Sequence, residues 1–198
     1  SIDSLRPDRY RHITGGGLLG PVLEGFEASS AIFPAPKLNV VVMRGVNDDE
    51  LSDFARFAMH HDSTVRFIEF MPLGHSPLAD ADPEAVLFTA EEIVSEIEDS
   101  LGPLVNLDST VDPGIGPARL MACPGGRGRI GLIHAMSRPF CESCNRLRLT
   151  ATGTLRSCLF DGGEVELAPL VASDDEVIRG AFASCAAFKP EVHRGRGE

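Results

Sequence analysis

Three cysteines in the second half of the chain could hold a metal. Cys141 and Cys144 form a Cys-x2-Cys pair, and Cys158 follows fourteen residues later, without a fourth cysteine to complete the set. Thiolates at this spacing suit zinc, another soft metal or an iron–sulfur cluster. A closed structural zinc site uses four protein ligands, whereas three leave one position open for a substrate. The spacing therefore permits either an incomplete zinc site or an open metal centre.

Arginines are concentrated around these cysteines. Segment 118–160 holds seven arginines, no lysine and one acid, so it carries +6 on a chain whose net charge is −11. Arg146 and Arg148 come directly after the Cys-x2-Cys pair. The planar guanidinium group matches phosphate oxygens. A local basic field on an acidic chain favours a small anionic ligand over nucleic acid.

The overall composition is that of a globular protein. The chain has 198 residues, 43% of them hydrophobic, which is enough for one domain or two small ones with a core. It has no apolar run near the roughly 20 residues that span a bilayer. Five cysteines, an odd number, argue against a disulfide scaffold and for a reducing compartment. We therefore expect a cytoplasmic protein that binds neither nucleic acid nor membrane.

The first half of the chain predicts alternating helices and strands. Short β-branched runs over 37–44 and 65–71 are typical of buried parallel strands. Helical spacing of apolar residues occurs over 20–30 and 51–58. Strands separated by helices of this length indicate βαβ units and a parallel sheet. Three pairs resemble helix N-terminal caps, namely Asn47 with Glu50, Thr89 with Glu92, and Ser173 with Glu176.

The second half predicts short strands and a final helix. The expected strands are 118–123, 129–133, 147–150 and 155–159, and the expected helix is 174–187. A tight turn at Thr152-Gly153 would fold the chain back as a hairpin and bring Cys158 beside the other two cysteines. We place a domain boundary near 103–117. An α/β part over 1–102 then precedes a smaller, metal-bearing part over 103–198.

Several motifs together resemble one enzyme family. They are Lys37–Glu50, Arg66–Gly74, Gly116–Arg119, Gly128–Gly131, Met136–Ser137, Phe140–Thr150 and Leu155–Phe160. These segments are similar to the GTP 3′,8-cyclases, radical S-adenosylmethionine lyases of molybdenum cofactor biosynthesis that convert GTP to 3′,8-cyclo-7,8-dihydro-GTP. The resemblance implies an α/β fold, with part of a TIM-type βα barrel followed by a small α+β iron–sulfur domain.

The resemblance also implies roles for particular residues. The ligands of a second, substrate-side 4Fe–4S cluster would be Cys141, Cys144 and Cys158. The residues that bind GTP would be Lys37, Arg146, Leu147 and Arg148. Met71 would contact S-adenosylmethionine, and Arg66 is a weaker candidate for the same polar site. Strand geometry alone would not select Lys37, because it lies at the N-terminal end of its run.

The chain departs from the family pattern at its beginning. The family's Cys-x3-Cys-x2-Cys motif, which binds the radical-generating cluster and S-adenosylmethionine, is not found here, since the first cysteine is Cys123. We therefore expect a truncated form whose activity alone is doubtful. The missing barrel half, or a second copy in a homodimer, would be its partner. The alternative is a zinc-stabilised binding module whose ligands are Cys141, Cys144, Cys158 and His134.

Overall fold

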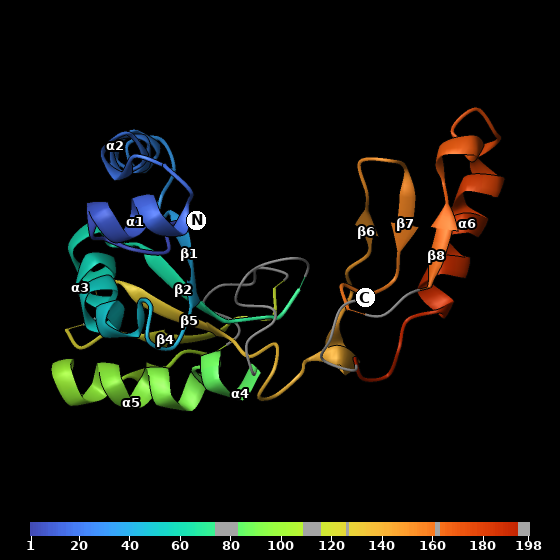
Figure 1. Ribbon diagram of the computed structural model, residues 1–198. Helices are drawn as coiled ribbons and strands as arrows, with labels where there is room; N and C mark the ends of the chain where they lie inside the picture. Colours follow the sequence, from blue (N-terminus) through green and yellow to red (C-terminus); the bar gives the residue numbers. More distant parts are fainter. Residues whose placement is uncertain (74–82, 109–115, 126, 161–162, 194–198) are drawn as a thin grey trace. The chain divides into compact units, whose positions relative to one another are not determined.

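The computed structural model describes residues 1–73, 83–108, 116–125, 127–160 and 163–193 (Figure 1). The chain divides into two compact units. The larger unit comprises 1–70 and 82–138, and the smaller unit comprises 71–81 and 139–198. Each has a sheet and a hydrophobic core of its own.

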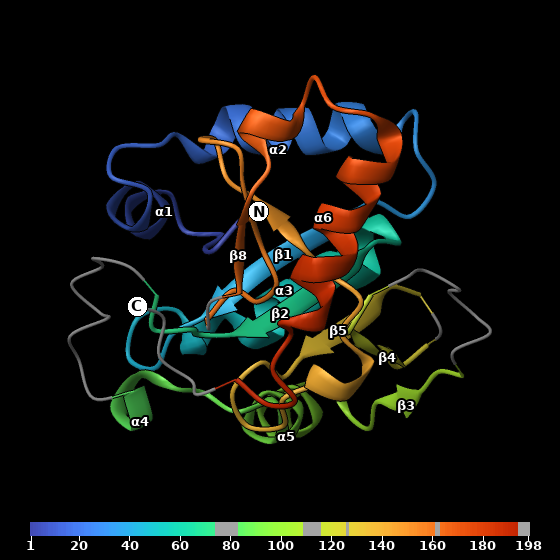
Figure 2. The same ribbon diagram turned by 90° about the vertical axis from the view of Figure 1, so that its right-hand side faces the viewer.

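A mixed five-stranded sheet forms the centre of the larger unit. Its order is β1-β2-β5-β4-β3, as Figure 2 shows. The strands are β1 (Lys37–Val42), β2 (Thr64–Glu69), β3 (Val105–Asn106), β4 (Arg119–Ala122) and β5 (Arg129–Ile133). β1, β2 and β5 run parallel, whereas β5, β4 and β3 are joined in antiparallel pairs. The fold is therefore α/β, and its two expected parallel strands are confirmed.

Helices cover one face of this sheet. The helices that contact the strands are α3 (Leu51–His61) and α5 (Ala90–Leu101). The larger unit also contains α1 (Pro7–Ile13), α2 (Leu19–Ser30), α4 (Pro83–Val86) and a 3-10 turn η1 (Asp48–Glu50) before α3. Alternate strand residues, among them Val40, Phe67 and Leu132, are almost fully buried against the helices. α2 continues this layer through the Phe26 ring, which lies 5.1 Å from the Phe57 ring of α3.

The opposite face of the sheet carries polar side chains. Asn39 of β1, Arg66 of β2 and Gly131 of β5 stand side by side in the strand register. Gly131 leaves space for the Arg66 side chain, because a Cβ at position 131 would lie 2.8 Å from Arg66 Cγ. Within the described part of the chain, Asn39 Oδ1 and Arg66 Nε are buried without a hydrogen-bond partner. This row is therefore a polar strip on the face that α3 and α5 do not cover.

The expected helix caps have different outcomes. Thr89 and Glu92 form the predicted capping box, and Gly102 is the C-cap of α5. Asn47 makes no cap bond; its side chain instead accepts from the Met43 amide at 2.8 Å and donates to two carbonyls. Tertiary contacts thus take the hydrogen bonds that a local cap would use. The cap predicted at Ser173 is also wrong, because the N-cap of the last helix is Asp174 and its side chain makes no cap bond.

The division between the units lies later than the boundary that we expected near 103–117. β5 pairs in parallel with β2, and β4 and β3 follow it in the same sheet. Residues 105–133 therefore belong to the larger unit, which ends at Arg138. Period-two strand patterns do not identify the partner of a strand, so this long-range pairing was not evident from the sequence.

The smaller unit is a three-stranded antiparallel sheet with one helix. Its elements are η2 (Cys141–Ser143), β6 (Arg148–Leu149), β7 (Thr154–Arg156), β8 (Glu164–Glu166), η3 (Ala168–Leu170) and α6 (Asp175–Ala187). Its core consists of Leu155, Leu167, Ala181 and Cys185, against which Leu147 packs. The predicted hairpin between β6 and β7 is confirmed, and its turn contains Gly153 at φ +86°.

The helices are too short or too polar to cross a membrane. Within the described ranges, no helix combines the length and the apolar composition that crossing a bilayer requires.

Two glycines between β4 and β5 permit a matched test of backbone packing. Gly128 has φ +74°, and a Cβ there would lie 2.5 Å from the backbone of Ala58 and Met59 in α3. Gly125 has φ +81° but open space around it. We expect Gly128→Ala to lower the free energy of unfolding by about 3 kcal/mol or more, from left-handed strain and overpacking together. Gly125→Ala should lower it by about 1–2 kcal/mol from strain alone. Urea denaturation measures both, and equal losses would contradict the close approach of Gly128 to α3.

Candidate metal and nucleotide site

The Cys-x2-Cys pair lies in a single tight turn. η2 begins at Cys141, and the amide of Cys144 donates to the carbonyl of Cys141 at 3.1 Å. The Phe140 ring supports the segment that follows, because the Arg146 guanidinium carbon lies 4.8 Å from its centroid. All five cysteines of the chain are free thiols; Cys141, Cys144 and Cys158 are half-buried. The pair is thus presented by a short turn with its sulfurs partly accessible.

The hairpin brings the Cys158 segment beside this turn. Arg148 of β6 lies opposite Arg156 of β7. Continuing this antiparallel register by two residues places Cys158 opposite Arg146, which is two residues after Cys144. Lys189 joins the same two segments, since its Nζ donates to the carbonyls of Arg146 at 2.6 Å and Ser157 at 2.9 Å.

The structure does not bring the three sulfurs into one ligating group. Among the described residues, no three His, Cys, Asp or Glu side chains are placed so that they could hold a metal ion. The adjacent segments therefore carry three thiols that can bind a metal. In this structure the three sulfur atoms do not surround a common point, as the ligands of a bound metal would. His134, the fourth ligand of the zinc alternative, follows β5 in the larger unit and joins no such group either.

The donor chemistry nevertheless fits a thiolate-bound metal. Partial burial raises the pKa of the Cys144 thiol, but hydrogen bonds from the backbone and side chain of Arg146, with the charges of Lys189 and Arg146, bring it below its ordinary value. Burial raises the pKa of Cys123 to about 11 and also raises that of Cys185. The pKa of Cys144 thus lies below that of an ordinary thiol, whereas burial keeps Cys123 and Cys185 protonated.

Arg146 and Arg148 face away from the core of the smaller unit. Both are exposed, whereas Leu147 between them packs against the core cluster. Alternate residues of an extended segment point to opposite sides, so the two arginines share one side. Arg156, opposite Arg148, is paired with Glu164 at 2.7 Å. The arrangement offers two guanidinium groups to an anion next to the Cys144 turn, while the Leu147 side chain contributes packing.

The other predicted site residues lie elsewhere in the chain. Lys37 is exposed at the N-terminal end of β1 in the larger unit. Arg66 lies on the polar strip of that unit. Met71 is half-buried two residues after the end of β2, and its carbonyl accepts from the Leu73 amide at 2.8 Å. It therefore lies where parallel strands commonly carry ligand-binding residues, at the carboxyl end.

Sequence reasoning missed two residues that organise these segments. One is Lys189, whose partners are backbone carbonyls far away in the chain. The other is Glu69, a fully buried carboxylate at the end of β2. Glu69 accepts from the amides of Ala90 at 3.0 Å and of Met136 and Ser137 at 2.8 Å each, and from the Ser137 hydroxyl. An acid inside an apolar strand is the signal that could have identified it.

Comparison with known proteins gives a consistent picture. The family model described as Molybdenum Cofactor Synthesis C matches residues 63–195. Proteins named GTP 3′,8-cyclase are similar over 98% of this chain: 43% identical in Alkaliphilus metalliredigens (strain QYMF), 42% in Moorella thermoacetica (strain ATCC 39073 / JCM 9320) and 41% in Geobacter sulfurreducens (strain ATCC 51573 / DSM 12127 / PCA). The chain spans 58% of the length of each of these curated relatives.

Proposed function

Because the chain belongs to the molybdenum cofactor synthesis C family, we propose that it is the substrate-binding portion of a GTP 3′,8-cyclase. The name of the relatives supplies the reaction and the substrate. One structural observation carries the assignment to particular residues. Continued by two residues beyond the Arg148–Arg156 pair, the β6–β7 register would set Cys158 opposite Arg146, two residues after Cys144, so that three free thiols and two exposed arginines come from adjacent segments.

In this proposal Cys141, Cys144 and Cys158 hold a 4Fe–4S cluster. A four-iron cluster with three cysteine ligands keeps one iron open to a donor atom of the substrate. Arg146 and Arg148 donate charge-assisted hydrogen bonds to the phosphate oxygens of GTP, and the core packing of Leu147 keeps both guanidinium groups on one side. The lowered pKa of Cys144 favours the thiolate that iron requires.

Two residues near the parallel strands complete the proposed assignments. We assign Lys37 to GTP, and Met71, just beyond the carboxyl end of β2, to S-adenosylmethionine. β1 and β2, parallel and covered by helices on one face, would be later strands of a TIM-type barrel in the whole protein. A Cys-x3-Cys-x2-Cys motif for the radical-generating cluster is not among the 198 residues. For this chain we therefore propose substrate and cluster binding, and we assign the radical chemistry to the whole protein.

Anaerobic reconstitution with iron and sulfide tests the metal assignment. We expect about four irons per chain, together with the visible absorption of a cluster. Cys158→Ala should lose most of this iron, whereas the matched control Cys123→Ala, which removes a buried thiol of the larger unit, should retain it. Stoichiometric zinc with no uptake of iron would contradict the proposal and would support the zinc-stabilised binding module instead.

A further inference from the structure

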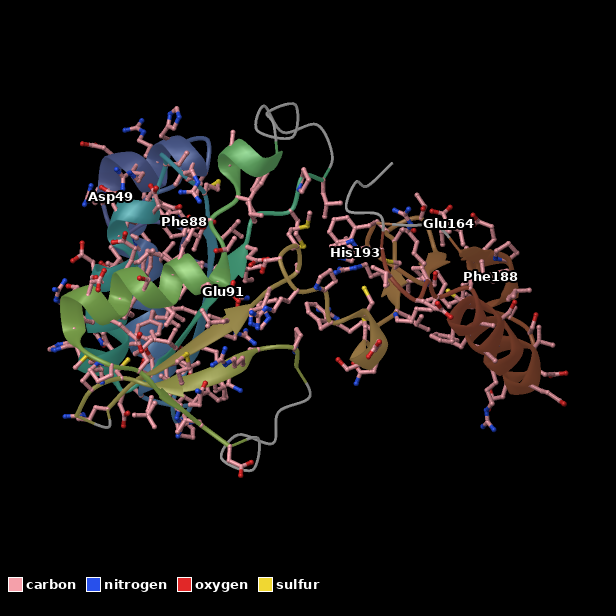
Figure 3. All side chains as sticks on the ribbon, turned by 90° about the horizontal axis from the view of Figure 1, so that it is seen from below. Asp49, Phe88, Glu91, Glu164, Phe188 and His193 are labelled. Carbon is pink, nitrogen blue, oxygen red and sulfur yellow. The ribbon has the colours of Figure 1, made fainter. Side chains whose placement is uncertain are left out.

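The segment after α6 lies against the β7–β8 hairpin of the smaller unit. The carbonyl of Phe188 accepts from the Ser157 hydroxyl at 3.4 Å, and the His193 ring stacks on Phe160 with centroids 4.2 Å apart. A Cβ at Gly163 would lie 2.6 Å from Phe188 Cβ, so the backbone there approaches closely. Phe188 and His193 are labelled in Figure 3. We call residues 188–193 the C-terminal strap.

Lys189 of this strap connects the two cysteine segments. Its ammonium donates to the carbonyl of Arg146, 43 residues earlier, and to that of Ser157, 32 residues earlier. Arg146 is two residues after Cys144, and Ser157 directly precedes Cys158. One side chain thus holds the backbone next to both cysteines.

The position of this bridge matters because the strand pairing ends before it. β6 and β7 pair only at Arg148–Arg156 and Leu149–Leu155. The cysteines lie beyond the Arg148–Arg156 pair, where these ladder pairs no longer join the two segments. A lysine near a helix end commonly caps the last carbonyls of its own helix. The two carbonyls that Lys189 binds instead belong to the segments that carry Cys144 and Cys158.

We propose that Lys189 is a positioning residue that sets the separation of Cys144 and Cys158 for metal binding. The inference rests on the proposed function, because a fixed separation of the two cysteines matters only if they bind a metal. The separation itself can be measured in the metal-free chain. The ammonium replaces the missing ladder bonds at the open end of the hairpin. Removing it takes away the two hydrogen bonds to the Arg146 and Ser157 carbonyls and lets the two cysteine segments separate.

The test uses thiol proximity in the metal-free chain. A short bifunctional thiol reagent and peptide mapping give the ratio of Cys144–Cys158 to Cys141–Cys144 cross-links, the second being an internal reference within one turn. We expect Lys189→Met to lower this ratio about tenfold, as loss of charge-assisted hydrogen bonds implies. Lys189→Arg should restore most of it. Arg179→Met, which removes one exposed positive charge from α6, should leave it unchanged.

Iron retention gives the second reading. After reconstitution, Lys189→Met should lose iron to a chelator faster than the wild-type chain, and Lys189→Arg should behave like the wild type. If the wild-type chain takes up no iron, the proposed function fails while the cross-link ratio still decides the role of Lys189. An unchanged ratio in Lys189→Met would overturn the inference. A loss of helical circular dichroism in that variant would overturn it too, by assigning Lys189 to general stability.

Discussion

Replacing Glu69 by alanine is expected to lower the free energy of unfolding of the larger unit by about 3–5 kcal/mol. The carboxylate is fully buried and accepts from three backbone amides and one hydroxyl. Removing it leaves the amides of Ala90, Met136 and Ser137 without an acceptor and also opens a cavity. Urea denaturation followed by circular dichroism measures the loss.

Two further variants separate the hydrogen bonds of Glu69 from the effect of removing an acid. Glu91→Ala is the matched control, because Glu91 of α5, labelled in Figure 3, is exposed. Among the described residues its side chain forms an exposed ion pair with Arg138 at 3.1 Å. Such a pair contributes no more than about 1 kcal/mol. Glu69→Gln keeps one acceptor oxygen and should recover part of the loss. A Glu69→Ala chain as stable as Glu91→Ala would show that the carboxylate does not hold the ends of β2, α5 and β5 together.

The double variant Arg146→Ala/Arg148→Ala is expected to bind GTP about 100-fold more weakly than the wild-type chain. Each guanidinium group makes charge-assisted hydrogen bonds to phosphate oxygens in the proposed complex, and two such contacts account for a loss of this size. Binding should also depend less on salt concentration, because two positive charges near the phosphates are gone. Anaerobic isothermal titration calorimetry on the reconstituted chain measures both effects.

The single variants resolve an ambiguity in that experiment. Arg146 also hydrogen-bonds Cys144, so its loss can alter the metal site as well as the nucleotide contact. Arg148→Ala removes the neighbouring guanidinium without that bond and should weaken GTP binding while the iron content stays constant. Arg148→Lys should restore only part of the affinity, because an ammonium cannot make the bidentate contact. GTP affinity unchanged in the double variant would exclude these two arginines as the phosphate site.

The sequence predicted the elements with strong local signals. The β-branched runs identified β1 and β2, Thr89 with Glu92 identified the start of α5, and Gly153 identified the β6–β7 turn. Each of these signals lies within a few residues of the structure that it specifies. The same hairpin turns the chain back toward the Cys144 turn, as predicted, but among the described residues the three sulfurs do not form one ligating group, and the site itself stays a prediction.

Interactions between distant segments could not be predicted in this way. β5 reads as a short strand, but nothing within it indicates that its partner is β2, about 60 residues earlier. Asn47 has the residue type of a helix cap, yet its side chain bonds to Asp3 and Val41 instead. Lys189 and Glu69 bind mainly backbone carbonyls and amides. Because nearly every residue type has these groups, the sequence does not indicate which residues are the partners.

The parallel pairing of β2 with β5 has a consequence for the order in which the protein is made. β2 is complete at Glu69, but β5 begins only at Arg129, and α5, β3 and β4 are made between them. At about 5–20 residues per second, a ribosome needs roughly 3–12 s for that interval. Throughout it, the edge of β2 that β5 will cover has no such partner, on a strand whose buried residues include the apolar Val65 and Phe67. The nascent chain is thus exposed to wrong pairing for seconds, and a chaperone that shields β2 during this time would act before the sheet can close.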